Sequence, residues 1–128
     1  MKLRVSLIFV AFLMLGLSAC GSDQSGAAGA IEEYIQALTS QEGELIANLA
    51  CAEWEEQAQI EVDSFTAVSA EIPELACQEA GTDGADTLVT CTGKIVLDYN
   101  GEKQELDVSV RTYRARQEGG EWRMCGYK

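Results

Sequence analysis

The sequence has 128 residues and a formal net charge of −12, which comes from 9 basic and 21 acidic residues with no histidine. Such acidity argues against a nucleic-acid partner, because no extended basic surface is available to neutralise a run of phosphates. The missing histidine removes the commonest general base and the usual catalytic triads, and it disfavours most zinc or iron centres.

The first segment has the features of a secretory leader. Two basic residues precede an apolar run from Val5 to Leu17, which ends in small residues before Cys20. This arrangement predicts a signal peptide over residues 1–19 that is removed from the mature protein. The alternative is an uncleaved membrane helix, because the uncharged stretch extends to Ser22 and reaches the lower length limit for a span.

The sequence Leu17-Ser18-Ala19-Cys20 resembles the lipobox of bacterial lipoproteins, in which the cysteine thiol receives a diacylglycerol and the leader is cut just before it. The resemblance implies that Cys20 is lipidated and that acyl chains such as palmitate hold the protein on a membrane. The protein would then face the extracytoplasmic side, at the cell surface or in the periplasm. Residues 20–28 have the composition of a flexible tether.

We expect residues 29–128 to form a single α+β domain that begins with three helices. A first helix over residues 29–39 is indicated by apolar residues at helical spacing: Ile31, Tyr34, Ile35 and Leu38. Thr39 and Glu42 fit a capping box for a second helix. A third, over residues 52–65, has an apolar face made of Trp54, Ala58, Val62 and Phe65. Its acidic residues, Glu61 among them, are expected to face mostly away.

After the third helix the apolar residues begin to alternate, which predicts an antiparallel sheet. Pro73 allows the segment 70–80 to be an edge strand but hardly a central one. Residues 81–84 indicate a turn. Asn100-Gly101, between two alternating runs, is the preferred dipeptide of a type I′ hairpin.

This hairpin predicts a register. A two-residue loop pairs Tyr99 with Glu102 and Lys94 with Asp107, and the same register continues to Gly93 with Val108 and Cys91 with Val110. One face of the hairpin is then apolar, and we expect it to be buried: Val89, Cys91, Ile95, Leu97, Leu106, Val108 and Val110. The other face carries opposite-charge pairs.

Gly119-Gly120 predicts a second hairpin, which leads into a last strand over residues 121–127 and completes a four-stranded meander. The simple register places Arg116 opposite Arg123, an unfavourable like-charge pair. A bulge near residues 111–113 would turn four further side chains inward: Tyr113, Ala115, Trp122 and Met124.

Four cysteines remain once Cys20 is assigned to lipid, and beyond the membrane an even number favours two disulfides. A zinc site is the alternative, but gaps of 26, 14 and 34 residues leave no close pair of ligands, so we expect no metal. In the meander, Cys77 and Cys91 lie on neighbouring strands. Cys51 would then join Cys125 and tie the helices to the last strand; pairing Cys91 with Cys125 links strands that are not adjacent and is less favoured.

The arrangement of helices before a curved antiparallel sheet is similar to the nuclear-transport-factor-2-like fold. It looks like the small bacterial lipoproteins with that domain, which join an early helix like the stretch at residues 33–38 to a closing Gly-x-Trp-x-x-Cys-Gly strand, here residues 120–126. The resemblance implies a cone with a pocket between helices and sheet. Five aromatic residues are possible lining, although core packing explains each of them as well: Tyr34, Trp54, Phe65, Tyr113 and Trp122.

The fold hosts enzymes, binding modules and assembly domains, so function must come from residues. Enzymes of the family, such as ketosteroid isomerases, use an aspartate base inside the cone, but the candidate aspartates Asp98 and Asp107 belong to the predicted solvent face. No phosphate loop or nucleophile elbow is present in the sequence. We therefore expect a non-catalytic binding or interaction module without a cofactor, whose partner is a protein or a small molecule in the cone. An isomerase or dehydratase is the remaining alternative.

Overall fold

The computed structural model describes residues 26–128, which form three helices followed by antiparallel strands. The helices are α1 (Ala27–Thr39), α2 (Gly43–Leu49) and α3 (Glu55–Ser64). The architecture is α+β, as predicted from the sequence. The predicted signal peptide, Cys20 and most of the predicted tether lie outside the described residues. None of the helices in residues 26–128 has the length and apolar character needed to cross a membrane.

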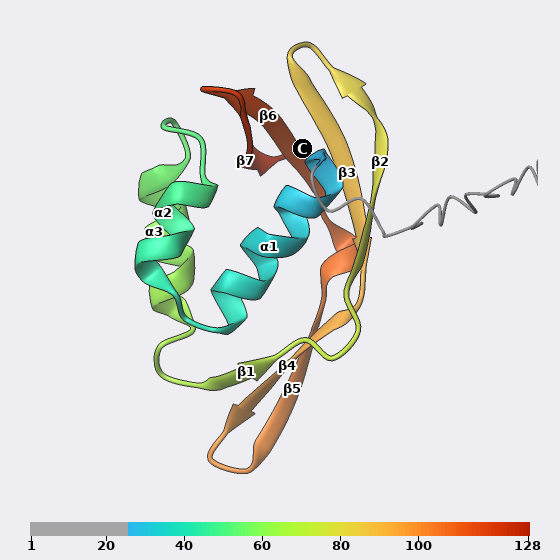
Figure 1. Cartoon of the computed structure of the whole chain (residues 1–128). Coiled ribbons are helices and arrows are strands. Elements are labelled where there is room, and N and C mark those ends of the chain that lie inside the picture. The colour runs from blue at the N-terminus through green and yellow to red at the C-terminus, as the bar shows by residue number, and fades with distance from the viewer. Residues whose placement is uncertain (1–25) are drawn as a thin grey trace, which may run out of the picture.

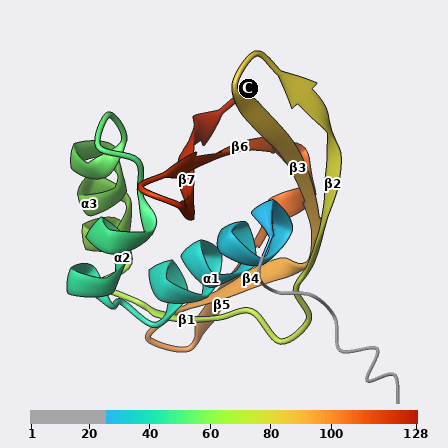
Figure 2. The same ribbon diagram turned by 45° about the horizontal axis from the view of Figure 1, so that its top comes forward.

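Helix α1 forms the centre of the molecule. The strands curl around it, and α2 and α3 pack on its other side (Figures 1 and 2). Its apolar stripe is buried, with Ile31, Tyr34 and Ile35 at most 1% exposed. The helix begins at Ala27, two residues earlier than predicted, because two small alanines and a glycine at its start pack closely against the sheet.

The start of the third helix was predicted too early. Residues 52–54 form a turn instead, in which the Trp54 N–H donates to the carbonyl of Cys51 at 2.8 Å and the Ala52 N–H donates to the side chain of Glu118 at 3.1 Å. The predicted capping box is also wrong. Thr39 lies inside α1, and its hydroxyl donates to the carbonyl of Gln36, while Glu42 makes no side-chain capping bond.

The predicted meander of four long strands is present, but three of its strands are interrupted. The first strand consists of β1 (Ser69–Glu71) and β2 (Ala76–Asp83), the second of β3 (Asp86–Thr92) and β4 (Lys94–Tyr99). The third consists of β5 (Glu102–Asp107) and β6 (Thr112–Glu118), separated by a 3₁₀ turn, η1 (Val108–Val110); the fourth is β7 (Glu121–Tyr127). The interruptions divide the strands into two sheets, ordered β1-β4-β5 and β2-β3-β6-β7.

The predicted hairpin register is confirmed from Tyr99–Glu102 to Lys94–Asp107, and the pairing breaks off after Gly93 and Val108. Val108 still donates its N–H to the carbonyl of Gly93, but η1 then takes the chain out of the strand, and the pairing of Cys91 with Val110 does not form. The apolar face is therefore only partly buried. Leu106, on β5, is 46% exposed, and Val110 is 78% exposed because η1 carries it out of the strand; the β4–β5 hairpin itself extends past the helices (Figure 1).

In the final hairpin the predicted Arg116–Arg123 pair is present, and its bulge lies between Arg114 and Ala115 rather than near residues 111–113. Tyr113, Ala115 and Met124 are buried as predicted, while Trp122 is half-buried. Acidic groups offset the like charges. Arg116 donates to Asp86 at 2.7 Å, and Arg123 pairs with Glu121 at 3.1 Å.

Both disulfides join the predicted pairs, Cys51 with Cys125 and Cys77 with Cys91. The second connects neighbouring strands at a directly opposed position of β2 and β3. The first connects the α2–α3 junction to β7, so it holds the outer helices against the sheet.

Asp86 predicts an acid-sensitive contribution to stability. Its side chain is 8% exposed, and hydrogen bonds from Arg116 and then Arg114 lower its pKa below the ordinary value. A lowered folded-state pKa stabilises the fold above the unfolded value, about 3.9, and this stabilisation is lost as the pH falls through the folded pKa. We expect urea unfolding of Asp86→Asn to show a weaker loss of stability below about pH 4 than the parent protein.

The control is Asp63→Asn, which removes an exposed carboxylate of α3. It should retain the full acid sensitivity of the parent protein. If Asp86→Asn and the parent lose stability with the same slope in acid, the assigned role of Asp86 is wrong.

Candidate functional site

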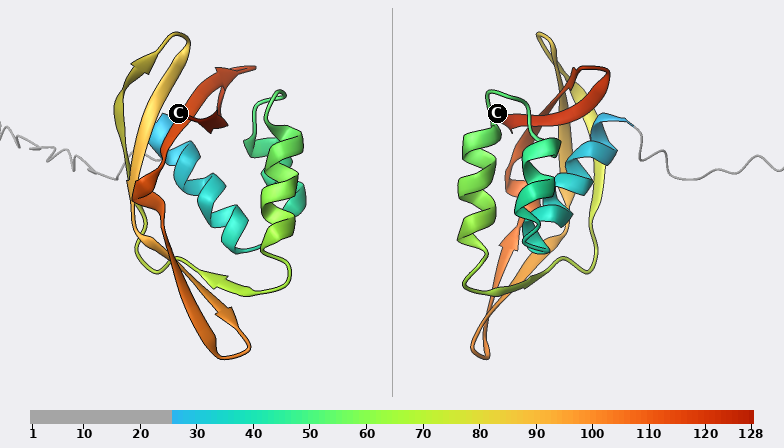
Figure 3. Two further views of the ribbon diagram at one scale, coloured as in Figure 1. Left: turned by 180° about the vertical axis from the view of Figure 1, so that it is seen from behind. Right: turned by 60° about the vertical axis from the view of Figure 1, so that its left-hand side comes forward.

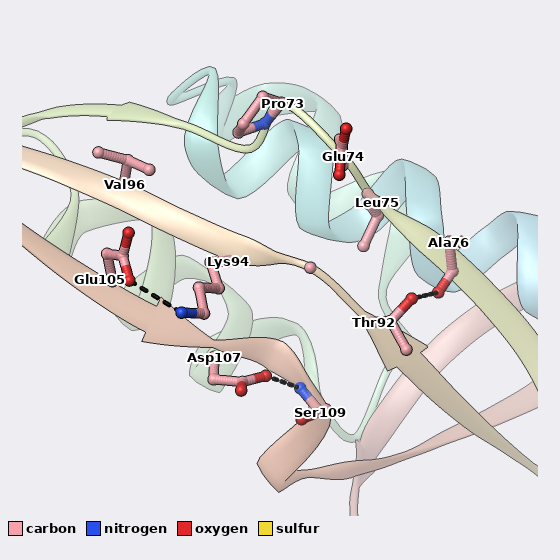
Figure 4. Close-up of a pocket in the computed structure, with 11 residues that line it drawn as sticks. Pro73, Glu74, Leu75, Ala76, Thr92, Lys94, Val96, Glu105, Asp107 and Ser109 are labelled. Atoms are coloured by element: carbon pink, nitrogen blue, oxygen red, sulfur yellow. Dashed lines mark hydrogen bonds and ion pairs between the residues drawn. The ribbon is translucent and has the colours of Figure 1, made fainter.

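A cavity of about 730 Å³ opens where the two sheets separate, between the start of β2 and strand β4 (Figure 4). Its polar groups are largely satisfied by one another. Lys94 pairs with Glu105 at 3.0 Å, and Asp107 accepts the N–H of Ser109 at 2.9 Å. These contacts hold the edge of the sheet together, and no polar groups converge on a common point within the cavity.

A second cavity, of about 540 Å³, lies between α3 and the strands. Helix α1 forms its floor, and β5, η1 and the residues after η1 form the opposite wall; Figure 3 shows α1 between the strands and the α2–α3 pair. We call it the α3 pocket. Its apolar and aromatic lining comes from Ile35, Leu38, Ile60, Phe65, Ile95, Leu106, Val108, Val110, Tyr113 and Tyr127.

The mouth of the α3 pocket is unusually apolar. Three large hydrophobic side chains that line it are exposed: Ile60 by 56%, Leu106 by 46% and Val110 by 78%. The fourth such side chain among residues 26–128, Tyr99, lies at the hairpin tip. Exposed apolar residues that gather around one concavity indicate a binding surface, whereas scattered ones need no explanation.

A carboxylate lies among these apolar groups. Glu61, on α3, accepts hydrogen bonds at Oε2 from the hydroxyls of Tyr34 at 2.7 Å and Tyr127 at 3.0 Å. Trp54 in turn donates its indole N–H to the Tyr34 hydroxyl at 3.2 Å. The three elements α1, α3 and β7 therefore meet at one acidic side chain.

The aromatic rings around Glu61 are packed edge to face. The ring centroid of Tyr127 lies 5.5 Å from that of Trp54 and 5.4 Å from that of Tyr113. Burial raises the pKa of Tyr34, Tyr127 and Tyr113, the last to about 12. All three phenols are therefore neutral at physiological pH, and the two that contact Glu61 serve as hydrogen-bond donors.

Arg111 provides the positive charge of the pocket. Its guanidinium carbon lies 4.5 Å from the ring centroid of Tyr127, a cation–π contact. Arg111 follows η1 and is exposed, so it sits at the rim rather than at the floor.

The structure brings together only some of the side chains proposed as lining. Phe65 and Tyr113 line the α3 pocket. Tyr34 is fully buried beneath it with its hydroxyl satisfied, and Trp54 supports Tyr34 from behind. Trp122 is not among the lining residues; it lies on β7 opposite Gln117 and packs, half-buried, against the core.

Sequence analysis missed Glu61, Tyr127 and Arg111 and expected Glu61 to face mostly outward. A usable signal was present, because Glu61 follows Ala58 by three residues and precedes Phe65 by four. It therefore shares the apolar stripe of α3. Nothing in the sequence indicated that phenols 27 residues before and 66 residues after it would satisfy its carboxylate.

Cys51, Glu118 and Cys125 form the cluster of potential metal ligands among the described residues. The two cysteines are joined in a disulfide, so no thiolate is available for a metal. Glu118 accepts the N–H of Ala52 at 3.1 Å. The cluster thus has a structural role.

No family model and no curated protein sequence matches this chain. A solved structure that is similar is the solution structure of a SEC-C motif containing protein from Rhodopseudomonas palustris, with a TM-score of 0.51 and 10% sequence identity. The match covers 80% of this chain and 78% of that one. At this identity the similarity shows a shared arrangement of the backbone and leaves function to the residues of the site.

Proposed function

We propose that this protein is a lipid-anchored, extracytoplasmic binding module with a nuclear-transport-factor-2-like domain, which takes an apolar small molecule into the α3 pocket without transforming it. The observation that carries the proposal is the pocket itself. Its volume of about 540 Å³ falls in the range of small-molecule sites, and its apolar lining surrounds a single half-buried carboxylate.

The hydrogen bonds of the site support a non-catalytic role. Tyr34 and Tyr127 both direct their hydroxyl protons to Glu61, so neither phenol has a proton left to polarise a substrate. A ketosteroid-isomerase type of site pairs a carboxylate base with a phenol that donates to the substrate, whereas both phenols here donate to Glu61 itself. The network instead fixes three side chains in place, as a rigid binding site requires.

The proposed location rests on the leader and the cysteines. The lipobox-like sequence ending at Cys20 supports lipid attachment, and two disulfides are typical of a compartment beyond the reducing cytosol. A protein held on the membrane by its lipid would present the domain close to the bilayer surface.

One mass measurement tests both parts of the proposal. The protein is extracted from its native membrane, and its intact mass is recorded under gentle and then denaturing conditions. We expect a chain that begins at Cys20, carries acyl groups and lacks one hydrogen for each disulfide cysteine. A small-molecule adduct should be present under gentle conditions and lost on denaturation.

Two variants test whether the adduct occupies the α3 pocket. Val110→Trp adds a large ring at the mouth of the α3 pocket and should remove the adduct, whereas Ser109→Trp fills the cavity at the sheet separation and should leave it bound. Both side chains are exposed, so the fold should tolerate both changes. A chain that still bears residues 1–19 without acyl groups contradicts the anchor. An adduct that survives Val110→Trp contradicts the assigned pocket.

A further inference from the structure

Glu61 is the feature of the α3 pocket that the fold alone does not explain. Its Oε2 accepts two phenol hydrogen bonds, but no hydrogen bond of residues 26–128 reaches its Oε1. No ion pair within these residues includes Glu61 either. A half-buried carboxylate without a cation costs solvation free energy that neutral donors offset only in part.

The pocket around Glu61 has a net negative charge. Three acids line it, Glu61, Glu105 and Asp107, against one base, Arg111. Glu105 is paired with Lys94 outside the pocket, and Asp107 is exposed to solvent, so Glu61 is the acid whose charge acts within the apolar interior. An unpaired acid of this kind favours a cationic ligand group over an anionic one.

The aromatic rings add a second preference for a cation. The face of Tyr127 already holds the guanidinium of Arg111 at 4.5 Å, which shows that a positive charge is accommodated over this ring. Tyr113 and Phe65 add further rings to the same lining. Carboxylates and ring faces together are the groups that recognise organic ammonium ions in proteins.

We propose that the α3 pocket binds an organic ammonium ion with an apolar or aromatic body, whose nitrogen pairs with Oε1 of Glu61. The apolar body lies against Ile60, Phe65 and Val110, and the ammonium enters toward α1. Arg111 competes with this ligand for the same site, because its guanidinium lies over the Tyr127 ring and is also attracted by the negative charge of Glu61. The inference rests on the proposed function, since it names the ligand class of the same pocket.

Three probes that share a phenethyl body and differ in charge test this inference. Phenethylamine is cationic at neutral pH, phenethyl alcohol is neutral and hydrocinnamate is anionic, while all carry the same arylalkyl body. Titration calorimetry of the full chain should give the tightest binding for phenethylamine. We expect about a tenfold preference over the alcohol, the ratio that one charge-assisted contact supplies.

Three variants test whether the negative charge of Glu61 is what attracts the cationic probe. Glu61→Gln keeps an oxygen for the two phenols and should weaken phenethylamine binding about tenfold, with little change for the alcohol. Glu56→Gln removes an equal charge from the same helix at an exposed position that does not line the pocket, and it should bind like the parent protein. Arg111→Gln removes the competitor and should strengthen phenethylamine binding.

The outcomes separate this inference from the proposed function. If hydrocinnamate binds most tightly and Arg111→Gln abolishes its binding, the pocket is an anion site, so the inference is overturned while the binding function stands. If Glu56→Gln weakens phenethylamine as much as Glu61→Gln does, the general acidity of the chain explains the binding and the inference is again overturned. Failure of all three probes to bind overturns the proposed function and the inference together.

Discussion

Replacing both Cys51 and Cys125 with alanine is expected to lower the free energy of unfolding by about 4 kcal/mol. The two cysteines are separated by 74 residues, so their disulfide closes a loop that includes α3 and six of the seven strands. A cross-link restricts the unfolded chain more as the loop becomes longer, which makes this the more stabilising of the two disulfides. Chemical denaturation of the double variant measures the loss.

This disulfide also positions the α3 pocket. Cys51 immediately precedes the turn that leads into α3, while Cys125 lies two residues before Tyr127 on β7. The bond therefore fixes the helix that carries Glu61 relative to the strand that carries one of its two phenol donors. Loss of the disulfide should weaken phenethylamine binding at temperatures where the variant remains folded.

The Cys77–Cys91 pair is the matched control. It closes a loop of only 14 residues between neighbouring strands, and its removal should cost about 3 kcal/mol without changing the pocket. The expected pattern is a larger loss of stability together with weaker binding for the Cys51–Cys125 variant. Equal losses in stability and unchanged binding in both variants would contradict the role assigned to Cys51–Cys125.

The features that sequence analysis predicted correctly are set by short-range signals. The apolar stripe of α1 has a helical period, and Asn100-Gly101 determines the register of the adjoining strands because Asn100 has the positive φ, 56°, that a type I′ turn requires. The disulfide pairs followed from that strand order. A local sequence pattern therefore predicts the structure correctly where a single residue type meets a local geometric requirement, as Asn-Gly does in this turn.

The interruptions of the long strands could not be predicted in the same way. Gly93 lies at a regular position of an alternating run, and only its φ of 135° and its contact with the β1–β2 connection show that the strand bends there. The same holds for Glu61, whose inward orientation depends on hydrogen bonds from α1 and β7. The site was missed because it depends on contacts between residues far apart in the sequence.

Gly93→Ala is expected to destabilise the protein by about 3 kcal/mol or more. The backbone of Gly93 has a φ of 135°, which L-amino acids rarely adopt, and an added Cβ would overlap the backbone carbonyl oxygen of Glu74. A backbone carbonyl cannot move aside as a flexible side chain can, so β4 would have to shift away from the β1–β2 connection. Thermal or urea unfolding of the single variant measures the loss.

The shift should also reach the α3 pocket, because the carbonyl of Gly93 accepts the N–H of Val108 at 3.1 Å and so positions η1, which bears Val110. Gly81→Ala separates the overlap from the backbone strain. Gly81 has a similar φ of 112°, but no atom lies within 4 Å of the added Cβ. We expect it to cost only about 1 kcal/mol and to leave phenethylamine binding intact. If the two variants are equally stable, the close approach of Glu74 to Gly93 does not determine where the sheet divides.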